Sequence, residues 1–201
     1  MNFDFTKKYV LENDFVLLRP LTASDKELLI AYGINEPEIW KFNVNGGNGK
    51  ENFENYFDTA LWLLNEKNHY PFIVFDKRNQ QFVGMTRFYE ISNEFSRLEI
   101  GYTWYGKKFQ GTGLNKSCKF LLLKFAFEQL GAIRVGFGAN SKNERSINAM
   151  KSIGCKVEGI LRDYSKDADG NVIDAIKLSI LKKEWDETAK EALKKQIGNK
   201  L

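Results

Sequence analysis

The segment spanning residues 104–116 constrains the fold of this 201-residue chain more than any other. It joins a strand-like stretch, 98–104, to residues 113–130, where apolar side chains recur at helical spacing. Glycines at 111 and 113 allow successive backbone N–H groups to turn toward one point, and the start of the helix adds unpaired donors and a positive dipole end. The segment predicts a phosphate or pyrophosphate site, although its glycines could also serve only to shape an ordinary strand-to-helix turn.

Two common phosphate-binding motifs do not fit this segment. A nucleotide-binding P-loop needs Lys and then Ser or Thr after its second glycine, whereas Gly113 is followed by Leu114. A dinucleotide fingerprint needs a third glycine where this chain has Lys116. The sequence therefore argues against a P-loop NTPase and against a nicotinamide cofactor.

The remaining periodic stretches mix the two kinds of secondary structure. Strand-like patterns cover residues 9–11, 15–19, 72–75, 82–88, 133–139, 155–161 and 173–181. Helical patterns cover residues 26–32, 51–65 and 144–153, and a charged, solvated helix is expected over 183–201. No repeat or Pro/Ser-rich linker interrupts them, so we expect one domain over 1–201, of α+β or α/β class.

Composition excludes several classes of function. Lys and Arg number 30 against 26 Asp and Glu, a net charge of +4, and no basic stripe interleaved with aromatic residues is present, so we expect no nucleic-acid partner. No apolar run reaches the ~18 residues of a membrane span, and the N-terminus does not resemble a secretory signal. With two cysteines and one histidine, we expect a reduced, cytoplasmic protein without a metal site or Cys–His catalysis.

Residues 108–113 resemble the pyrophosphate loop of the GNAT superfamily, the acetyl-CoA-dependent N-acetyltransferases. The strand at 98–104 and the segments 143–147 and 153–159 also resemble family motifs. The two ends of the resemblance, which runs from about residue 15 to 185, are similar to the ribosomal-protein-alanine N-acetyltransferase branch. This implies a GNAT fold, a central, mostly antiparallel mixed sheet flanked by helices.

The resemblance also implies an activity, acetyl transfer from acetyl-CoA to a primary amine. The first choice of acceptor is an α-amino group of a protein or peptide, and the alternative is a small amine such as a polyamine or aminoglycoside. A non-catalytic acyl-CoA-binding sensor is a third reading. Homodimers are common among such proteins, but the sequence does not indicate a pairing surface.

The residues that the resemblance assigns to the cofactor form three groups. They are the strand end Tyr102, Thr103 and Trp104, the loop Lys108, Phe109, Gln110, Gly111, Thr112, Gly113 and Leu114, and the pair Asn143 and Ser146. Lys108 replaces the more usual Arg or Gln, which keeps a donor and a charge but loses the planar fork. Asn143 and Ser146 have a second reading, as a helix N-cap and a solvated serine.

Acetyl transfer needs a neutral amine, and a carboxylate near the site can accept its proton. The resemblance places such a base at Glu99; the alternative is a solvent-facing carboxylate or one paired with Arg87 or Arg97. Many relatives carry a general-acid tyrosine where this chain has Met150, which cannot donate a proton. The substitute is then another group, such as Tyr102, Tyr105 or Ser146, or else water.

A few further positions are candidates for contact with the acceptor or with the outer phosphate of the cofactor. Trp40, Phe42 and the loop 45–50 fall where the family builds its acceptor wall, but the aromatics could equally be core residues. Lys116 and Lys119 are either near the outer phosphate or on a solvated helix face. No role is assigned to His69.

Overall fold

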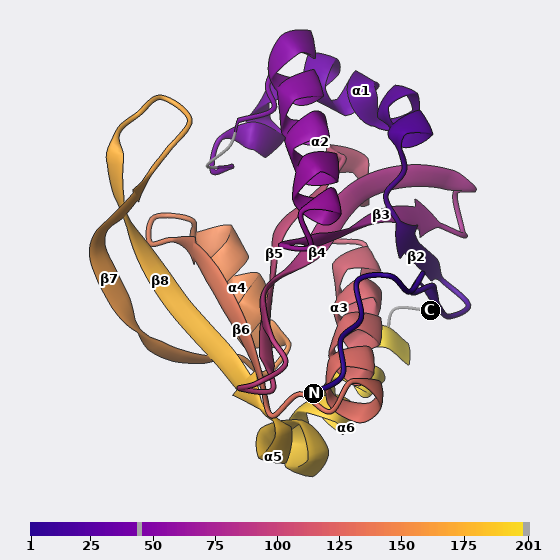
Figure 1. Cartoon of the computed structure of the whole chain (residues 1–201), viewed down its shortest axis with the longest axis vertical. Helices are drawn as coiled ribbons and strands as arrows, with labels where there is room; N and C mark the ends of the chain where they lie inside the picture. The colour runs from indigo at the N-terminus through magenta and orange to yellow at the C-terminus, as the bar shows by residue number, and fades with distance from the viewer. Residues whose placement is uncertain (44–45, 199–201) are drawn as a thin grey trace.

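The sheet that organises the molecule has eight strands in the order β1-β2-β3-β4-β5-β6-β8-β7 (Figure 1). The computed structural model describes residues 1–43 and 46–198. The strands are β1 (Leu11–Glu12), β2 (Val16–Pro20), β3 (Tyr70–Asp76), β4 (Gln81–Ser92), β5 (Arg97–Tyr105), β6 (Arg134–Asn140), β7 (Lys156–Lys166) and β8 (Val172–Leu181). Neighbours are antiparallel except β5 and β6, which run parallel, so the expected mostly antiparallel mixed sheet of a GNAT fold is confirmed.

Helices cover both faces of this sheet (Figure 1). On one face lie α1 (Lys26–Asn35), α2 (Lys50–Asn65) and the 3-10 turn η2 (Pro37–Trp40). On the other lie α3 (Leu114–Lys124), α4 (Glu144–Ser152), α6 (Lys190–Gly198) and the π-helical turns η4 (Phe125–Gln129) and η5 (Trp185–Ala189). The shorter pieces are η1 (Ala23–Asp25), η3 (Lys107–Phe109) and α5 (Lys182–Glu184).

Each face of the sheet has its own apolar core, because side chains alternate between the faces along a strand. Met85 and Trp104 point toward α2, whereas Val83 and Tyr105 belong to the core beneath α3. On the α2 face the two helices pack very closely: a Cβ added to Gly33 would lie 2.6 Å from Cβ of Phe53. The central strands therefore lie between two buried layers, whereas the edge strand β7 is exposed along most of its length.

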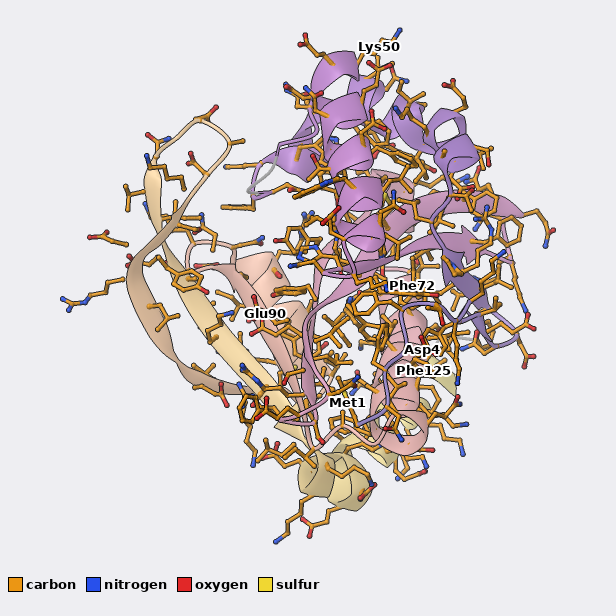
Figure 2. The ribbon with its side chains drawn as sticks, in the orientation of Figure 1. Met1, Asp4, Lys50, Phe72, Glu90 and Phe125 are labelled. Carbon is orange, nitrogen blue, oxygen red and sulfur yellow. The ribbon has the colours of Figure 1, made fainter. Side chains whose placement is uncertain are left out.

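The first residues of the chain form part of the core under α3, which the sequence patterns do not predict. Phe3 is buried against the rings of Tyr70 and Phe88. The amide of Asn2 donates to the carbonyl of Leu130 at 2.9 Å, which holds the segment beside the end of the α3–η4 helix (Figure 2).

The long expected helix over 113–130 is present as α3 continued by η4, and Gly131 follows it with φ of +79°. The expected charged helix over 183–201 is present as the consecutive pieces α5, η5 and α6. Trp185 in η5 is fully buried and donates to Glu128 at 3.0 Å. Residue 45 of the expected acceptor loop, the preceding residue 44, and residues 199–201 of the expected last helix lie outside the described residues.

Candidate active site

The glycine loop leads from β5 into the first turn of α3. Gly111 and Gly113 have φ of +76° and +93°, backbone conformations that favour glycine, and Gly113 is the N-cap of the helix. Apart from its two chain neighbours, no described residue has an atom within 4 Å of a Cβ added at Gly111. The amide of Leu114 donates to Oγ1 of Thr112 at 3.4 Å, and the amides that follow it in the first turn have no acceptor inside the helix, so the loop presents donors at the start of α3.

Side chains of the glycine loop fix it to the core under α3. Phe109 and Leu114 are buried in the core under α3. Gln110 donates from Nε2 to the carbonyl of Tyr105 at 2.9 Å, and its Oε1 accepts from Arg145 at 2.6 Å. Two charged side chains therefore lie beside the backbone donors: Lys108, which is exposed, and Arg145, in the first turn of α4. Sequence reasoning missed Arg145, which only the approach of α4 to the loop brings here.

Lys107 and Thr112 also act locally. Lys107 is paired with Glu38 at 2.8 Å, so its charge is already engaged. The Thr112 hydroxyl donates to the carbonyl of Phe109 at 2.8 Å, which closes the turn before the helix. The loop is therefore shaped by its own hydrogen bonds before any ligand arrives.

Beyond the loop, β5 separates from its parallel neighbour. The β5–β6 ladder has only the pairs Arg97↔Arg134, Leu98↔Val135 and Glu99↔Gly136, although both strands continue. On its other side, β5 changes register with β4 near Tyr102, whose φ is +50°. Main-chain groups of β5 after Glu99 thus have no β6 partner. The carbonyl of Tyr102 accepts from the hydroxyl of Tyr56 at 3.4 Å, and the other groups on this edge can pair with an extended ligand.

The three strand-end positions expected at the cofactor contribute different surfaces. The Trp104 ring lies in the core under α2, 5% exposed, and the Thr103 side chain points to the α3 face. Tyr102 points to the α2 face, where its ring lies 5.2 Å from that of Tyr89. At Thr103 and Trp104, therefore, only the backbone faces the separation between β5 and β6.

Glu99, at the end of the short parallel ladder, is held by two donors. The Tyr89 hydroxyl donates to it at 2.6 Å and Lys177 from β8 lies 3.1 Å from both carboxylate oxygens. A Cβ added to Gly136 would lie 2.9 Å from Cγ of Glu99, so the glycine makes room for this side chain to cross β6. The carboxylate is paired with Lys177, and not with Arg87 or Arg97 as the alternative reading had it.

Arg87 stands two residues before Tyr89 on β4, so the two side chains lie on the same face of the sheet. It is 1% exposed, and its guanidinium carbon lies 4.1 Å from the ring centroid of Tyr102 and 5.3 Å from that of Tyr56. One terminal nitrogen is 3.3 Å from Nδ1 of His69; the other, NH2, is buried with no hydrogen-bond partner among the described residues. Burial, and then the nearby Arg87 charge, lowers the pKa of His69 to about 4, so this ring is neutral near pH 7.

The tyrosines of this face are held in their neutral form. Burial, followed by the charge of Glu99 and its hydrogen bond, raises the pKa of Tyr89 far above its ordinary value. Burial also raises the pKa of Tyr102, against the opposing effect of Arg87. Sequence reasoning missed Tyr89 and Lys177, and it gave His69 no role; no local motif marks them.

Lys119 differs from both sequence readings, since it faces neither solvent nor the loop. It is 5% exposed, and its Nζ donates to Oγ1 of Thr103 at 2.7 Å and to that of Thr86 at 3.4 Å. Burial lowers the pKa of this amine to about 8. α3 therefore directs a cation into the sheet, on the side opposite Arg87.

The start of α4 has the geometry of the simpler reading. Oδ1 of Asn143 accepts from the amide of Ser146 at 3.1 Å, which makes Asn143 the helix N-cap. Met150 is 7% exposed in the core. Tyr105 is also buried beneath α3, where its hydroxyl lies 3.3 Å from Asn115. Of the substitutes expected for a general acid, Tyr102 and Ser146 are half-buried and Tyr105 is enclosed.

At the expected acceptor wall, Trp40 follows the alternative sequence reading, that of a core residue. Trp40 is only 2% exposed, with its ring 4.8 Å from Trp104 and its Nε1 donating to the carbonyl of Tyr32 at 3.1 Å. Trp40 is thus a core residue that supports the wall, whereas Phe42 is half-buried. The tip of the β7–β8 hairpin approaches this region, where a Cβ at Gly46 would lie 3.8 Å from Cβ of Ala168.

Comparison with known proteins agrees with this geometry. Residues 16–156 match the model of the acetyltransferase (GNAT) domain. The chain belongs to the GNAT acetyltransferase family. GNAT acetyltransferases use acetyl-CoA, and the open glycine loop with its donors suits the diphosphate of that co-substrate.

Individual relatives extend over most of this GNAT chain. It is 29% identical over 178 residues to p20 of Bacillus licheniformis, named as an uncharacterized N-acetyltransferase, covering 87% of this chain and 97% of that protein. It is 34% identical over 103 residues to YdaF of Bacillus subtilis, whose name presents it as a candidate ribosomal N-acetyltransferase, covering 51% and 55%. A solved GCN5-related N-acetyltransferase from Brucella melitensis shares the fold, with a TM-score of 0.86 at 23% identity over 95% and 86% of the two chains.

The described part of this GNAT chain contains no group of three or more His, Cys, Asp or Glu side chains arranged to hold a metal ion. Within residues 1–43 and 46–198, no helix is long and apolar enough to cross a membrane.

Proposed function

We propose that this GNAT enzyme transfers the acetyl group of acetyl-CoA to the α-amino group of a protein or peptide. The observation that carries the proposal is the continuity of three features: the open glycine loop, the unpaired edge of β5 and the carboxylate of Glu99 at the point where β5 and β6 separate. The first suits a diphosphate, the second an extended amide-containing arm, and the third an amine.

The donor is held mainly by main-chain groups. The amides at the start of α3 receive the diphosphate, with Lys108 and Arg145 adding charge. The β5 backbone over residues 102–104 pairs with the pantetheine arm and supplies an N–H to the oxygen of the tetrahedral intermediate. Asn143 shapes the start of α4 beside Arg145.

Glu99 acts as the general base. Lys177 and Tyr89 hold its carboxylate in position, and it accepts a proton from the amine, directly or through one water, as the nitrogen bonds to the acetyl carbon and the carbon–sulfur bond breaks. The leaving thiolate takes a proton from Tyr102, from Ser146 or from water. An α-amine, with a reference pKa of about 7.7–8.0, is far more often neutral at pH 7 than a lysine at about 10.4, which favours the α-amine as acceptor.

The name of YdaF supports a protein acceptor. A polycation such as a polyamine is the weaker candidate, because two cations, Arg87 and Lys177, lie in the same group of side chains as Glu99. This group, the polar cluster, consists of Glu99, Tyr89, Lys177, Tyr102, Arg87 and His69. A non-catalytic acyl-CoA sensor would use the same loop without needing Glu99.

Thiol release from acetyl-CoA, measured with a panel of peptides, polyamines and aminoglycosides, tests the proposal. Changing Glu99→Gln should lower kcat at pH 7 by about 10²-fold and leave the affinity for acetyl-CoA unchanged, because general-base catalysis typically contributes that much. Glu90→Gln is the matched control, since Glu90 is an exposed carboxylate on β4 (Figure 2). Equal rates for Glu99→Gln and the native enzyme would remove Glu99 from the mechanism. Tight acetyl-CoA binding with no turnover on any acceptor would favour the sensor.

A further inference from the structure

Arg87 is a buried cation without a counter-ion. Its side chain is 1% exposed and forms no ion pair with a described residue, and its NH2 atom has no hydrogen-bond partner there. Removing a charge from water without pairing it is costly, and buried guanidinium groups are ordinarily paired with carboxylates. An unpaired donor in this position therefore needs a physical explanation.

The neighbouring groups do not balance this charge. The carboxylate of Glu99 already accepts from Tyr89 and Lys177. Glu90 is exposed on β4 and forms no ion pair in the described structure. His69 is neutral near pH 7, because its pKa is lowered to about 4. The rings of Tyr102 and Tyr56 stabilise the cation partly, through its attraction to their faces.

The position of Arg87 connects it to the reaction centre. Its ring partner Tyr102 lies 5.2 Å from the ring of Tyr89, which hydrogen-bonds the proposed base Glu99. Tyr102 and Tyr89 are both half-buried, so the cover over Arg87 on this side consists of side chains that reach the surface. Two side chains in contact, Tyr89 and Tyr102, thus connect a reactant placed against Glu99 to the unpaired donor.

Resting on the proposed function, we propose that Arg87 is a carboxylate subsite, which binds a carboxylate of the acceptor or of the acyl group on the donor. A carboxylate there accepts a charge-assisted hydrogen bond from NH2 and supplies the missing negative charge. The corresponding substrates are a peptide with an acidic first residue, or a dicarboxylic acyl group such as succinyl. A polycationic acceptor is disfavoured by the same charge.

Two pairs of matched substrates separate these sources. The first pair compares tetrapeptides beginning with Asp or Asn, both with acetyl-CoA. The second compares succinyl-CoA with acetyl-CoA on one neutral peptide. The expected result is at least a tenfold higher kcat/KM for the carboxylate member of one pair. A preference in the first pair places the carboxylate on the acceptor, and one in the second places it on the donor. Measurable turnover with no preference in either pair overturns the proposal.

Variants show whether the preference comes from Arg87. Arg87→Met should abolish it while sparing the uncharged member of the pair, and Arg87→Lys should retain part of it. Arg97→Gln, an exposed arginine at the start of β5, is the control and should behave like the native enzyme. A variant that loses both members of the pair equally would give Arg87 a structural role and overturn the subsite. If Arg87→Met does not fold, as judged by thermal unfolding, Arg87→Lys carries the comparison alone.

A binding measurement keeps this proposal separate from the proposed function. Calorimetric titration of the CoA-bound enzyme with the Asp and Asn peptides needs no turnover, and the same titration with succinyl-CoA and acetyl-CoA tests the donor. If no acceptor is acetylated but the native protein binds a carboxylate member more tightly and Arg87→Met does not, the subsite stands and the proposed reaction fails. Equal binding within both pairs would overturn the subsite, whatever the activity.

Discussion

Replacing Lys119 with Met should stabilise the protein at neutral pH, although it removes two hydrogen bonds. The ammonium is enclosed between α3 and the sheet, with two hydroxyl groups as partners and no paired carboxylate among the described residues. Its pKa is lowered from 10.5 to about 8 by burial. At about 1.4 kcal/mol per pKa unit, keeping this group charged in the folded state costs about 3 kcal/mol. Thr86 and Thr103 remain bonded to each other at 2.8 Å in the variant, so no hydroxyl is orphaned.

The pH dependence of Lys119→Met makes the prediction specific. Below about pH 8, Lys119 is charged in both the folded and the unfolded protein, and the full cost is present. Between about 8 and 10.5 the folded protein releases this proton first, so the unfolded state binds more protons and the native free energy of unfolding rises with pH. The advantage of the variant should therefore shrink from about 3 kcal/mol at pH 7 toward zero at pH 10.5.

Urea unfolding of both proteins at several pH values measures this difference, since other titrating groups are common to both and cancel. Lys116→Met, on the same helix and only half-buried, is the control for a Lys-to-Met change outside the core. A variant less stable than the native protein at pH 7, or a difference that stays constant from pH 7 to 10.5, would refute the reasoning.

Two further predictions concern the loop and the α2 face. Gly113→Ala should weaken acetyl-CoA binding at least tenfold in calorimetry, because φ of +93° strains any residue with a Cβ. The control Gly159→Ala, where the added Cβ meets no atom of the described residues within 4 Å, should not, and equal affinities of the two variants would contradict the role of the loop. The native protein should lose up to about 3 kcal/mol of stability as pH falls from 6.5 to 4, because the unfolded chain protonates His69 first, and urea unfolding of His69→Gln should lack this part of the slope.

The glycine loop and its flanking elements could be predicted because their signals are local. The period changes from strand to helix within residues 98–130, and glycines stand where the backbone needs positive φ. Asn143 as an N-cap is another local signal, read from one residue before a helical pattern. The resemblance to the GNAT family then predicted the mostly antiparallel mixed sheet around the loop.

The polar cluster on the α2 face could not be predicted, because long-range pairing assembles it. Lys177 reaches Glu99 across 78 residues of sequence, and only because β8 pairs with β6 beside two glycines. The contact of Arg87 with Tyr102 depends on a register shift between β4 and β5 that no local pattern encodes. The prediction for Lys119 was wrong for a similar reason: its neighbour Cys118 marks the buried face, but the hydroxyl groups that accept hydrogen bonds from Lys119 come from β4 and β5.

The three residue pairs that join β5 to β6 are the only main-chain ladder between two wings of the sheet, β1–β5 and β6–β8, among the described residues. A ligand that forms hydrogen bonds to both β5 and β6 beyond Glu99 would lengthen this connection between the wings, which we call the seam. The ligand's own atoms would then take the place of missing strand pairs. Donor binding should then slow amide exchange on both sides of the seam together, as one cooperative unit, rather than only at the loop.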